Sequence, residues 1–145
     1  MSRRKQDLAK RDLYKITTLR HQLASAKIAR LMRDLQSAEH KEQAFGEQLA
    51  RLHHETQLAQ SASLSQMTNN LSGIGVYQGI LRMLDVEIRR TEVRKDMQAD
   101  ECRMLRGALS SQRKSLERLE IRLDLYKKML RLVRVMEADG RDDQD

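Results

Sequence analysis

The second half of the chain carries one uninterrupted heptad repeat, and this feature limits the possible folds more than any other. Alternate steps of four and three residues from Tyr77 meet a largely apolar series that continues for eight heptads to Val133. Its members are Tyr77, Leu81, Leu84, Ile88, Thr91, Lys95, Gln98, Cys102, Leu105, Leu109, Gln112, Leu116, Leu119, Leu123, Tyr126, Leu130 and Val133. A 3.5-residue repeat predicts a coiled-coil seam, which the polar Thr91, Lys95 and Gln98 should weaken locally.

The first half contains a shorter repeat with the same spacing. It is formed by Ile28, Leu31, Leu35, Ala38, Glu42, Phe45, Leu49, Leu52, Thr56 and Ala59. Further upstream, Leu8, Ile16, Leu19 and Leu23 form a stripe displaced by about one residue, as a nearly straight helix or a stutter would produce. We therefore expect the seam to drift toward these four residues near the N-terminus.

A single break separates the two repeats. The chain has no proline, and short polar residues and glycines gather only at 68–75, where Ser72 could cap the following helix. The abundant residues are Leu, Arg, Gln, Glu, Lys, Ala and Met, which favour helices. Only 3% of the chain is aromatic, which argues against a β-sandwich or a doubly wound α/β domain.

These patterns predict an all-α fold in which two long helices form an antiparallel coiled-coil hairpin, a rod with both chain ends at one end. The predicted segments are a first arm at 1–67, a turn at 68–76, a second arm at 77–137 and an acidic, disordered tail at 138–145. Facing residues should have numbers that add up to about 142. Examples are Ile16 with Tyr126, Leu23 with Leu119, and Leu49 with Val93. The alternative is a parallel dimer of extended chains, hinged at the break.

Positive charge is concentrated in two segments. Residues 3–33 contain ten Lys/Arg and two Asp, and residues 103–134 contain ten Lys/Arg and three acids, although the whole chain has a net charge of only +7. In the hairpin these segments lie side by side and form a basic end. Such an end favours an acidic surface, which could be a protein pore, a membrane face or a nucleic acid. Solvation of the outer helix faces explains a high charge content but not charge of a single sign.

No group of residues predicts catalysis, a metal site or a cofactor. The four histidines, His21, His40, His53 and His54, include no pair spaced four residues apart, and Cys102 is the only cysteine. Gly73, Gly75 and Gly79 do not form a phosphate-binding loop. We therefore expect a protein that is not an enzyme, in a reducing cytoplasm. The most apolar run, 129–136, is too short and too charged to span a membrane, and the basic start lacks the apolar run of a secretory signal.

Two other functions remain open at this stage. Nucleic-acid binding would use the dense Lys and Arg residues, but the chain offers no aromatic platform for base stacking. Its basic residues are also divided between the two ends of the chain, unlike the continuous basic helix of a leucine-zipper protein. The second alternative is a coiled-coil spacer or scaffold without a specific partner.

A motif just past the break resembles a family of export proteins. It reads Tyr77-Gln78-Gly79-Ile80-Leu81-Arg82-Met83-Leu84-Asp85-Val86-Glu87-Ile88. This pattern is similar to the start of the second helix in FliJ, the flagellar export stalk protein, which shares its architecture with the YscO-type stalk proteins of virulence type III secretion. The chain length, the break near residue 70 and the basic N-terminal arm agree with this resemblance.

The resemblance implies a stalk similar to the central γ stalk of rotary ATP synthases, in the bacterial cytoplasm and peripheral to the inner-membrane export apparatus. Its expected partners are a hexameric export ATPase, whose assembly and hydrolysis it promotes, an export gate membrane protein, and export chaperones. Neither nucleic acid nor direct membrane insertion is expected. The ATPase-binding candidates in the basic end are Arg3, Arg4, Lys5, Lys10, Arg11, Lys15, Lys127, Lys128, Arg131 and Arg134.

The family's gate contact maps onto two residues of the motif, Ile80 and Leu84. Leu84 also lies on the seam, where an apolar residue could serve only as core, whereas Ile80 lies just off it. Glu87 departs from the family pattern, which has an alanine-like residue there. The sequence does not separate a flagellar from a virulence system.

Overall fold

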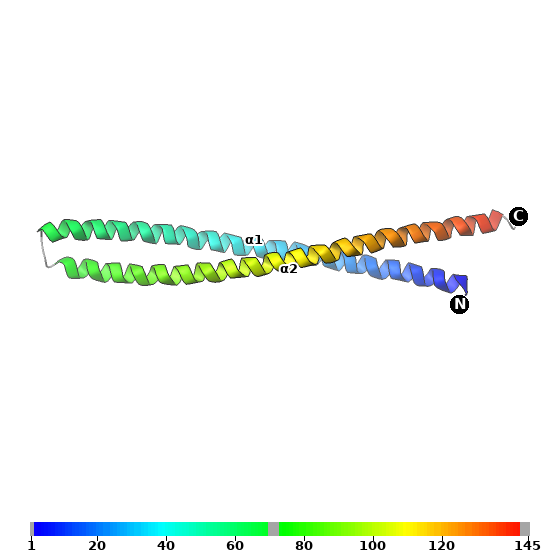
Figure 1. The fold of residues 1–145 in the computed structure, drawn as a ribbon, viewed down its shortest axis with the longest axis horizontal. Helices are drawn as coiled ribbons and strands as arrows, with labels where there is room; N and C mark the ends of the chain where they lie inside the picture. Colours follow the sequence, from blue (N-terminus) through cyan, green and yellow to red (C-terminus); the bar gives the residue numbers. More distant parts are fainter. Residues whose placement is uncertain (1, 70–72, 143–145) are drawn as a thin grey trace. The chain divides into compact units, whose positions relative to one another are not determined.

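The computed structural model describes residues 2–69 and 73–142, and two long helices account for nearly all of them. Helix α1 spans Arg3–Asn69 and helix α2 spans Ile74–Asp142. The two helices pack against each other in opposite directions (Figure 1), so the predicted all-α, antiparallel coiled-coil hairpin is confirmed.

The helix ends differ from the predicted segment boundaries. The backbone carbonyl of Ser2 accepts hydrogen bonds from the amides of Lys5 and Gln6 at 3.0 and 3.3 Å, which places Ser2 at the N-cap of α1. Helix α1 extends two residues into the predicted turn, and α2 continues to Asp142, so residues 138–142 of the predicted acidic tail are helical. The proposed cap at Ser72 lies outside the described residues.

Contacts within the chain define two units. The terminal unit combines Met1–Arg33 with Gly107–Asp145, and the loop unit comprises Asp34–Arg106. In each unit a segment of α1 lies beside an antiparallel segment of α2 (Figure 1). The contacts between the two helices include Arg3 with Met136 at 3.2 Å, His21 with Glu120 at 3.3 Å, Met32 with Arg113 at 3.9 Å and Glu39 with Arg106 at 3.1 Å. The numbers of these pairs add up to between 139 and 145, in agreement with the predicted register.

The seam is the core of each unit. All seventeen predicted seam residues of α2, from Tyr77 to Val133, are buried or half-buried, and so are the ten predicted residues of α1 from Ile28 to Ala59. Thr91 and Cys102 are completely buried, with 0% exposure. The Thr91 hydroxyl donates to the carbonyl of Glu87 at 2.8 Å, so this buried polar group is satisfied within its own helix.

The expected drift of the seam toward the N-terminal leucines is wrong. Leu8, Ile16, Leu19 and Leu23 are all exposed, Leu23 by 71%. The seam instead continues from Ile28 toward the N-terminus with the same heptad spacing. The residues at these positions are buried or half-buried: Asp7, Lys10, Tyr14, Thr17, His21 and Ala24. The physical reason is that the apolar repeat of α2 is uninterrupted, so α1 stays opposite to it only by keeping the same heptad frame.

The three facing pairs predicted from the register are therefore not seam contacts. Ile16 and Leu23 point away from α2, and Val93, the predicted partner of Leu49, is also exposed. The register itself is right, but each of these pairs contains a residue from the outer side of its helix.

Candidate functional site

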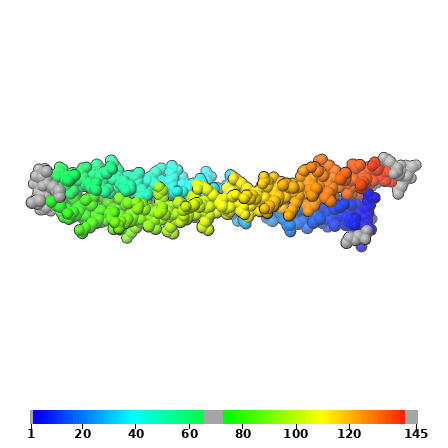
Figure 2. All heavy atoms as spheres, in the orientation of Figure 1, coloured from blue at the N-terminus to red at the C-terminus, as the bar shows by residue number. Residues whose placement is uncertain are grey.

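The terminal unit contains all ten residues that were predicted to form the basic end. The first turns of α1 and the last turns of α2 are in contact there, as the blue and orange-red atoms of Figure 2 show. Nine of the ten side chains are exposed, and Lys10 is half-buried on the seam. The two basic segments thus meet within one unit, as the charge pattern predicted.

Two grooves between α1 and α2 bring some of these residues together. The first, of about 620 Å³, has Arg3, Arg4, Lys10 and Arg11 of α1 on one side and the last turns of α2, including Met136, on the other, and Asp7 and Glu137 also line it. The second, of about 380 Å³, is lined by Arg11, Tyr14, Lys15, Leu130, Val133 and Arg134. The predicted residues outside both grooves are Lys5, Lys127, Lys128 and Arg131.

Most of this positive charge has no acidic partner among the described residues. Lys128 pairs with Asp124 at 3.1 Å, and the other nine predicted bases form no ion pair with a described carboxylate. Helix α1 also has no acid in its first turn, which holds Arg3, Arg4 and Lys5 at the positive end of the helix dipole. This arrangement is electrostatically unfavourable in the free protein, and a negatively charged partner would relieve it.

An exposed apolar stripe lies on the same part of α1. At about 100° per residue, Leu8, Ile16, Leu19 and Leu23 fall within an arc of about 80°, roughly opposite the seam. Lys5 and Lys15 share this side of the helix, so the surface is basic and apolar together. Sequence reasoning missed this surface because it assigned the leucines to the seam. Continuing the heptad frame of Ile28 upstream would have placed them outside it.

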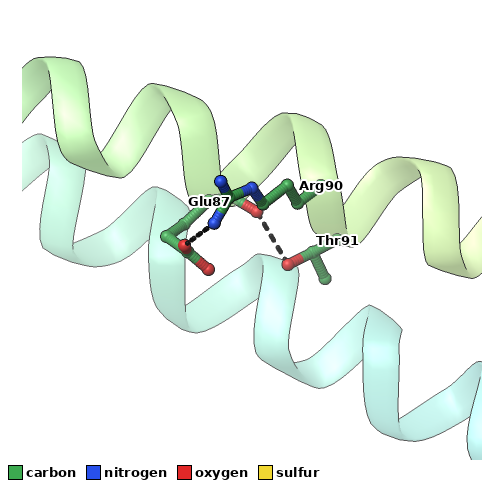
Figure 3. Close-up of polar contacts among 3 residues, drawn as sticks. All are labelled: Glu87, Arg90 and Thr91. Atoms are coloured by element: carbon green, nitrogen blue, oxygen red, sulfur yellow. Dashed lines mark hydrogen bonds and ion pairs between the residues drawn. The ribbon is translucent and has the colours of Figure 1, made fainter.

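The two gate candidates have different environments in the loop unit. Ile80 is 41% exposed, whereas Leu84 is half-buried on the seam against α1. The nearby Glu87 carboxylate pairs with Arg90 at 3.2 Å, and the backbone carbonyl of Glu87 accepts a hydrogen bond from the Thr91 hydroxyl (Figure 3). Ile80 is thus the residue with apolar surface free for a partner, and Leu84 contributes to the core.

The surroundings of Cys102 perturb the ionisation of its thiol. Burial in the seam raises the pKa of its thiol, and a hydrogen bond to Glu42 and the charge of that carboxylate raise the pKa further. A thiol in this setting is a poor nucleophile. Among residues 2–69 and 73–142, no cluster of three or more His, Cys, Asp or Glu is arranged to hold a metal ion.

Comparison with known proteins leaves the family open. No protein-family model matches this chain, and no curated protein or solved structure shows significant similarity to it. Neither α1 nor α2, over its described length, has a stretch apolar enough to cross a membrane. The residues of the chain and the surfaces that they form are therefore the basis for assigning its function.

Proposed function

We propose that this protein is a stalk component of a type III protein export apparatus, of the FliJ or YscO type. Its basic terminal unit inserts into the hexameric export ATPase and promotes ring assembly and activity. The observation that carries this proposal is the terminal unit itself, in which bases from both ends of the chain adjoin an exposed apolar stripe. The protein acts in the bacterial cytoplasm, peripheral to the inner-membrane export apparatus.

The apolar stripe favours a protein partner over a nucleic acid. Phosphate groups are contacted by charged and polar side chains, and Leu19 or Leu23 would gain nothing by facing them. Protein interfaces instead combine a desolvated apolar centre with a polar rim. An acidic, partly apolar ring lumen would satisfy both the unpaired bases and these leucines.

The loop unit is the part of the chain that we assign to the export gate. The support is Ile80, whose exposed apolar side chain lies in the motif that resembles the family. Leu84 contributes to this contact by holding the start of α2 against α1 rather than by touching the gate. The proposal includes the handling of export chaperones, to which no residue is assigned.

The ATPase contact is tested by a pair of matched charge reversals. Arg11→Glu with Lys15→Glu changes two exposed bases of the terminal unit, and Lys41→Glu with Arg51→Glu makes the same change of charge in the loop unit. We expect the first variant to bind the hexameric export ATPase at least about tenfold more weakly, because it replaces attraction by repulsion at the ring. The second should bind as the wild type does, and circular dichroism should show equal helicity in both. If both variants lost the same affinity for the ATPase, the loss would follow from the change in net charge alone. This result would contradict a binding site in the terminal unit.

The gate contact is tested by Ile80→Asp in the loop unit. We expect this variant to bind the cytoplasmic domain of the export gate protein at least about tenfold more weakly, because a carboxylate in an apolar contact is left desolvated. Its thermal unfolding should match that of the control Gln78→Asp, an exposed neighbour. Loss of the thermal transition in Ile80→Asp alone would show that Ile80 belongs to the core.

A further inference from the structure

Helix α2 carries a second heptad repeat on the side that faces away from α1. In the loop unit, steps of three and four residues from Val76 reach nine positions up to Met104. Six of them hold apolar side chains, and all six are exposed: Val76, Met83, Val86, Val93, Met97 and Met104. We call these nine positions the outer stripe.

The outer stripe is as regular as the seam and locally more apolar. At about 100° per residue it lies roughly 160° from the seam, and on the face seen in Figure 2 α1 lies along one side of α2 in this unit. Between residues 91 and 98 the seam holds Thr91, Lys95 and Gln98, whereas the outer stripe holds Val93 and Met97. An exposed apolar series with heptad spacing is the pattern of a helix that packs against a further helix.

The two charged members of the outer stripe are ion-paired on their own helix. The guanidinium of Arg90 lies 3.2 Å from the carboxylate of Glu87 (Figure 3), and Asp100 pairs with Arg103. Each charge is therefore compensated one turn away. The aliphatic stem of Arg90 remains available to cover an apolar neighbour on a partner helix.

We propose that a second copy of this chain packs antiparallel along the outer stripe, around a two-fold axis between residues 91 and 92. In this register Glu87 faces Arg94 of the partner subunit, and Arg89 faces Asp96 of the partner subunit. The two-fold axis repeats both attractive pairs, so four pairs flank the centre of the interface. Arg94 and Asp96 are exposed and form no ion pair with another described residue, so both are available for this contact.

Other registers are electrostatically worse. Sliding the partner by one heptad in either direction places Glu87 opposite a carboxylate, that of Glu87 or Glu101 of the partner subunit. The same shifts place Arg89 opposite an arginine. A parallel, in-register arrangement places Arg90 opposite Arg90 of the partner subunit, so two like charges meet within the apolar interface. The proposed register has one kind of unfavourable pair, Arg82 with Arg103 of the partner subunit, and the two-fold axis repeats it, so two such pairs lie at the outer edges of the interface against four attractive pairs near its centre.

The apolar layers of this register also fit. Val86 faces Met97 of the partner subunit, and a layer nearer the edge of the interface places Gly79 opposite Met104 of the partner subunit. Gly79 has open space where a side chain would project, with no heavy atom within 4 Å, so the long methionine can be accommodated there. A small residue opposite a large one is the complementarity that a packed coiled-coil layer requires.

The self-association is tested by sedimentation equilibrium of the full chain. We expect a dimer at protein concentrations on the order of 100 μM. Val93→Glu with Met97→Glu should raise the dimer dissociation constant about a hundredfold or more, because it puts four carboxylates at the centre of the interface. The matched control, Leu19→Glu with Leu23→Glu, changes equally exposed residues of the terminal unit and should leave the constant unchanged.

The orientation is tested by disulfide cross-linking in a Cys102→Ala background. Val86→Cys mixed with Met97→Cys should form a cross-linked dimer, whereas either variant alone should not, because each residue faces the other across the two-fold axis. Self-cross-linking of Met97→Cys alone would overturn the antiparallel register. A wild-type monomer, or a dimer that Val93→Glu with Met97→Glu leaves intact, would overturn the interface. These outcomes do not decide the ATPase contact of the export proposal, because that contact lies in the terminal unit.

Discussion

Cys102 is the residue at which burial has its clearest chemical consequence. Its thiol is completely buried, and desolvation, followed by the hydrogen bond to Glu42, raises its pKa above the ordinary value of 9.0. Between the unfolded and folded pKa values the folded chain binds more protons than the unfolded chain. The thiol's contribution to the free energy of unfolding is therefore complete below about pH 9 and is lost as the pH rises through the folded pKa.

This linkage predicts a pH-dependent difference between the wild type and Cys102→Ala. Urea unfolding followed at pH 8 and pH 10 should show that the wild type loses more stability over this interval than the variant, which has no thiol to ionise. The variant is the control for every other group that titrates in the same range. Parallel losses in the two proteins would show that the thiol ionises as easily in the folded chain as in the unfolded one.

At the scale of single helices, the heptad frame was the reliable signal and local hydrophobicity was the misleading one. All predicted seam residues of α2 are buried or half-buried, although Thr91, Lys95 and Gln98 are polar. A periodicity argument identifies residues that share a face, but it does not say which of two apolar faces meets the neighbouring helix. For this reason the sequence predicted the seam of α2, placed the leucines of α1 wrongly and left the outer stripe unnoticed.

The corrected position of the α1 leucines gives a stability prediction. Leu23→Gln should change the free energy of unfolding by no more than about 0.5 kcal/mol, because Leu23 is 71% exposed. Leu119→Gln should lower it by about 2 kcal/mol or more, because Leu119 lies on the seam. Chemical denaturation of both variants measures the difference. Similar losses would mean that Leu23 is packed in solution.

Helix α2 also contains a position at which its own stability can be raised. Gly107 lies in the helix interior on the outer side, and a Cβ there would meet no heavy atom within 4 Å. Gly107→Ala should therefore raise the free energy of unfolding by up to about 1 kcal/mol, because alanine loses less conformational entropy in a helix. Thermal unfolding followed by circular dichroism would show an increase in Tm. A decrease would mean that helix propensity does not decide stability at Gly107.

At the scale of the whole molecule, the distribution of charge is the feature that the sequence predicted best. Two basic segments separated by about seventy residues meet in one unit because the chain reverses direction once. What the charge pattern could not predict was the apolar stripe beside these bases, since that depends on which side of α1 faces α2. The resulting surface is both basic and apolar, and this combination is the reason for preferring an acidic protein partner to a nucleic acid.

The central claim is that the terminal unit binds the export ATPase ring through its charge. The most direct measurement titrates the protein against the hexameric export ATPase, following ring assembly and ATP hydrolysis together at about 50 mM and about 500 mM salt. We predict that the protein promotes both and that high salt abolishes most of the effect, because exposed charges are screened. Absence of ring binding at low salt, together with tight salt-dependent binding to DNA or RNA in the same format, would contradict the claim.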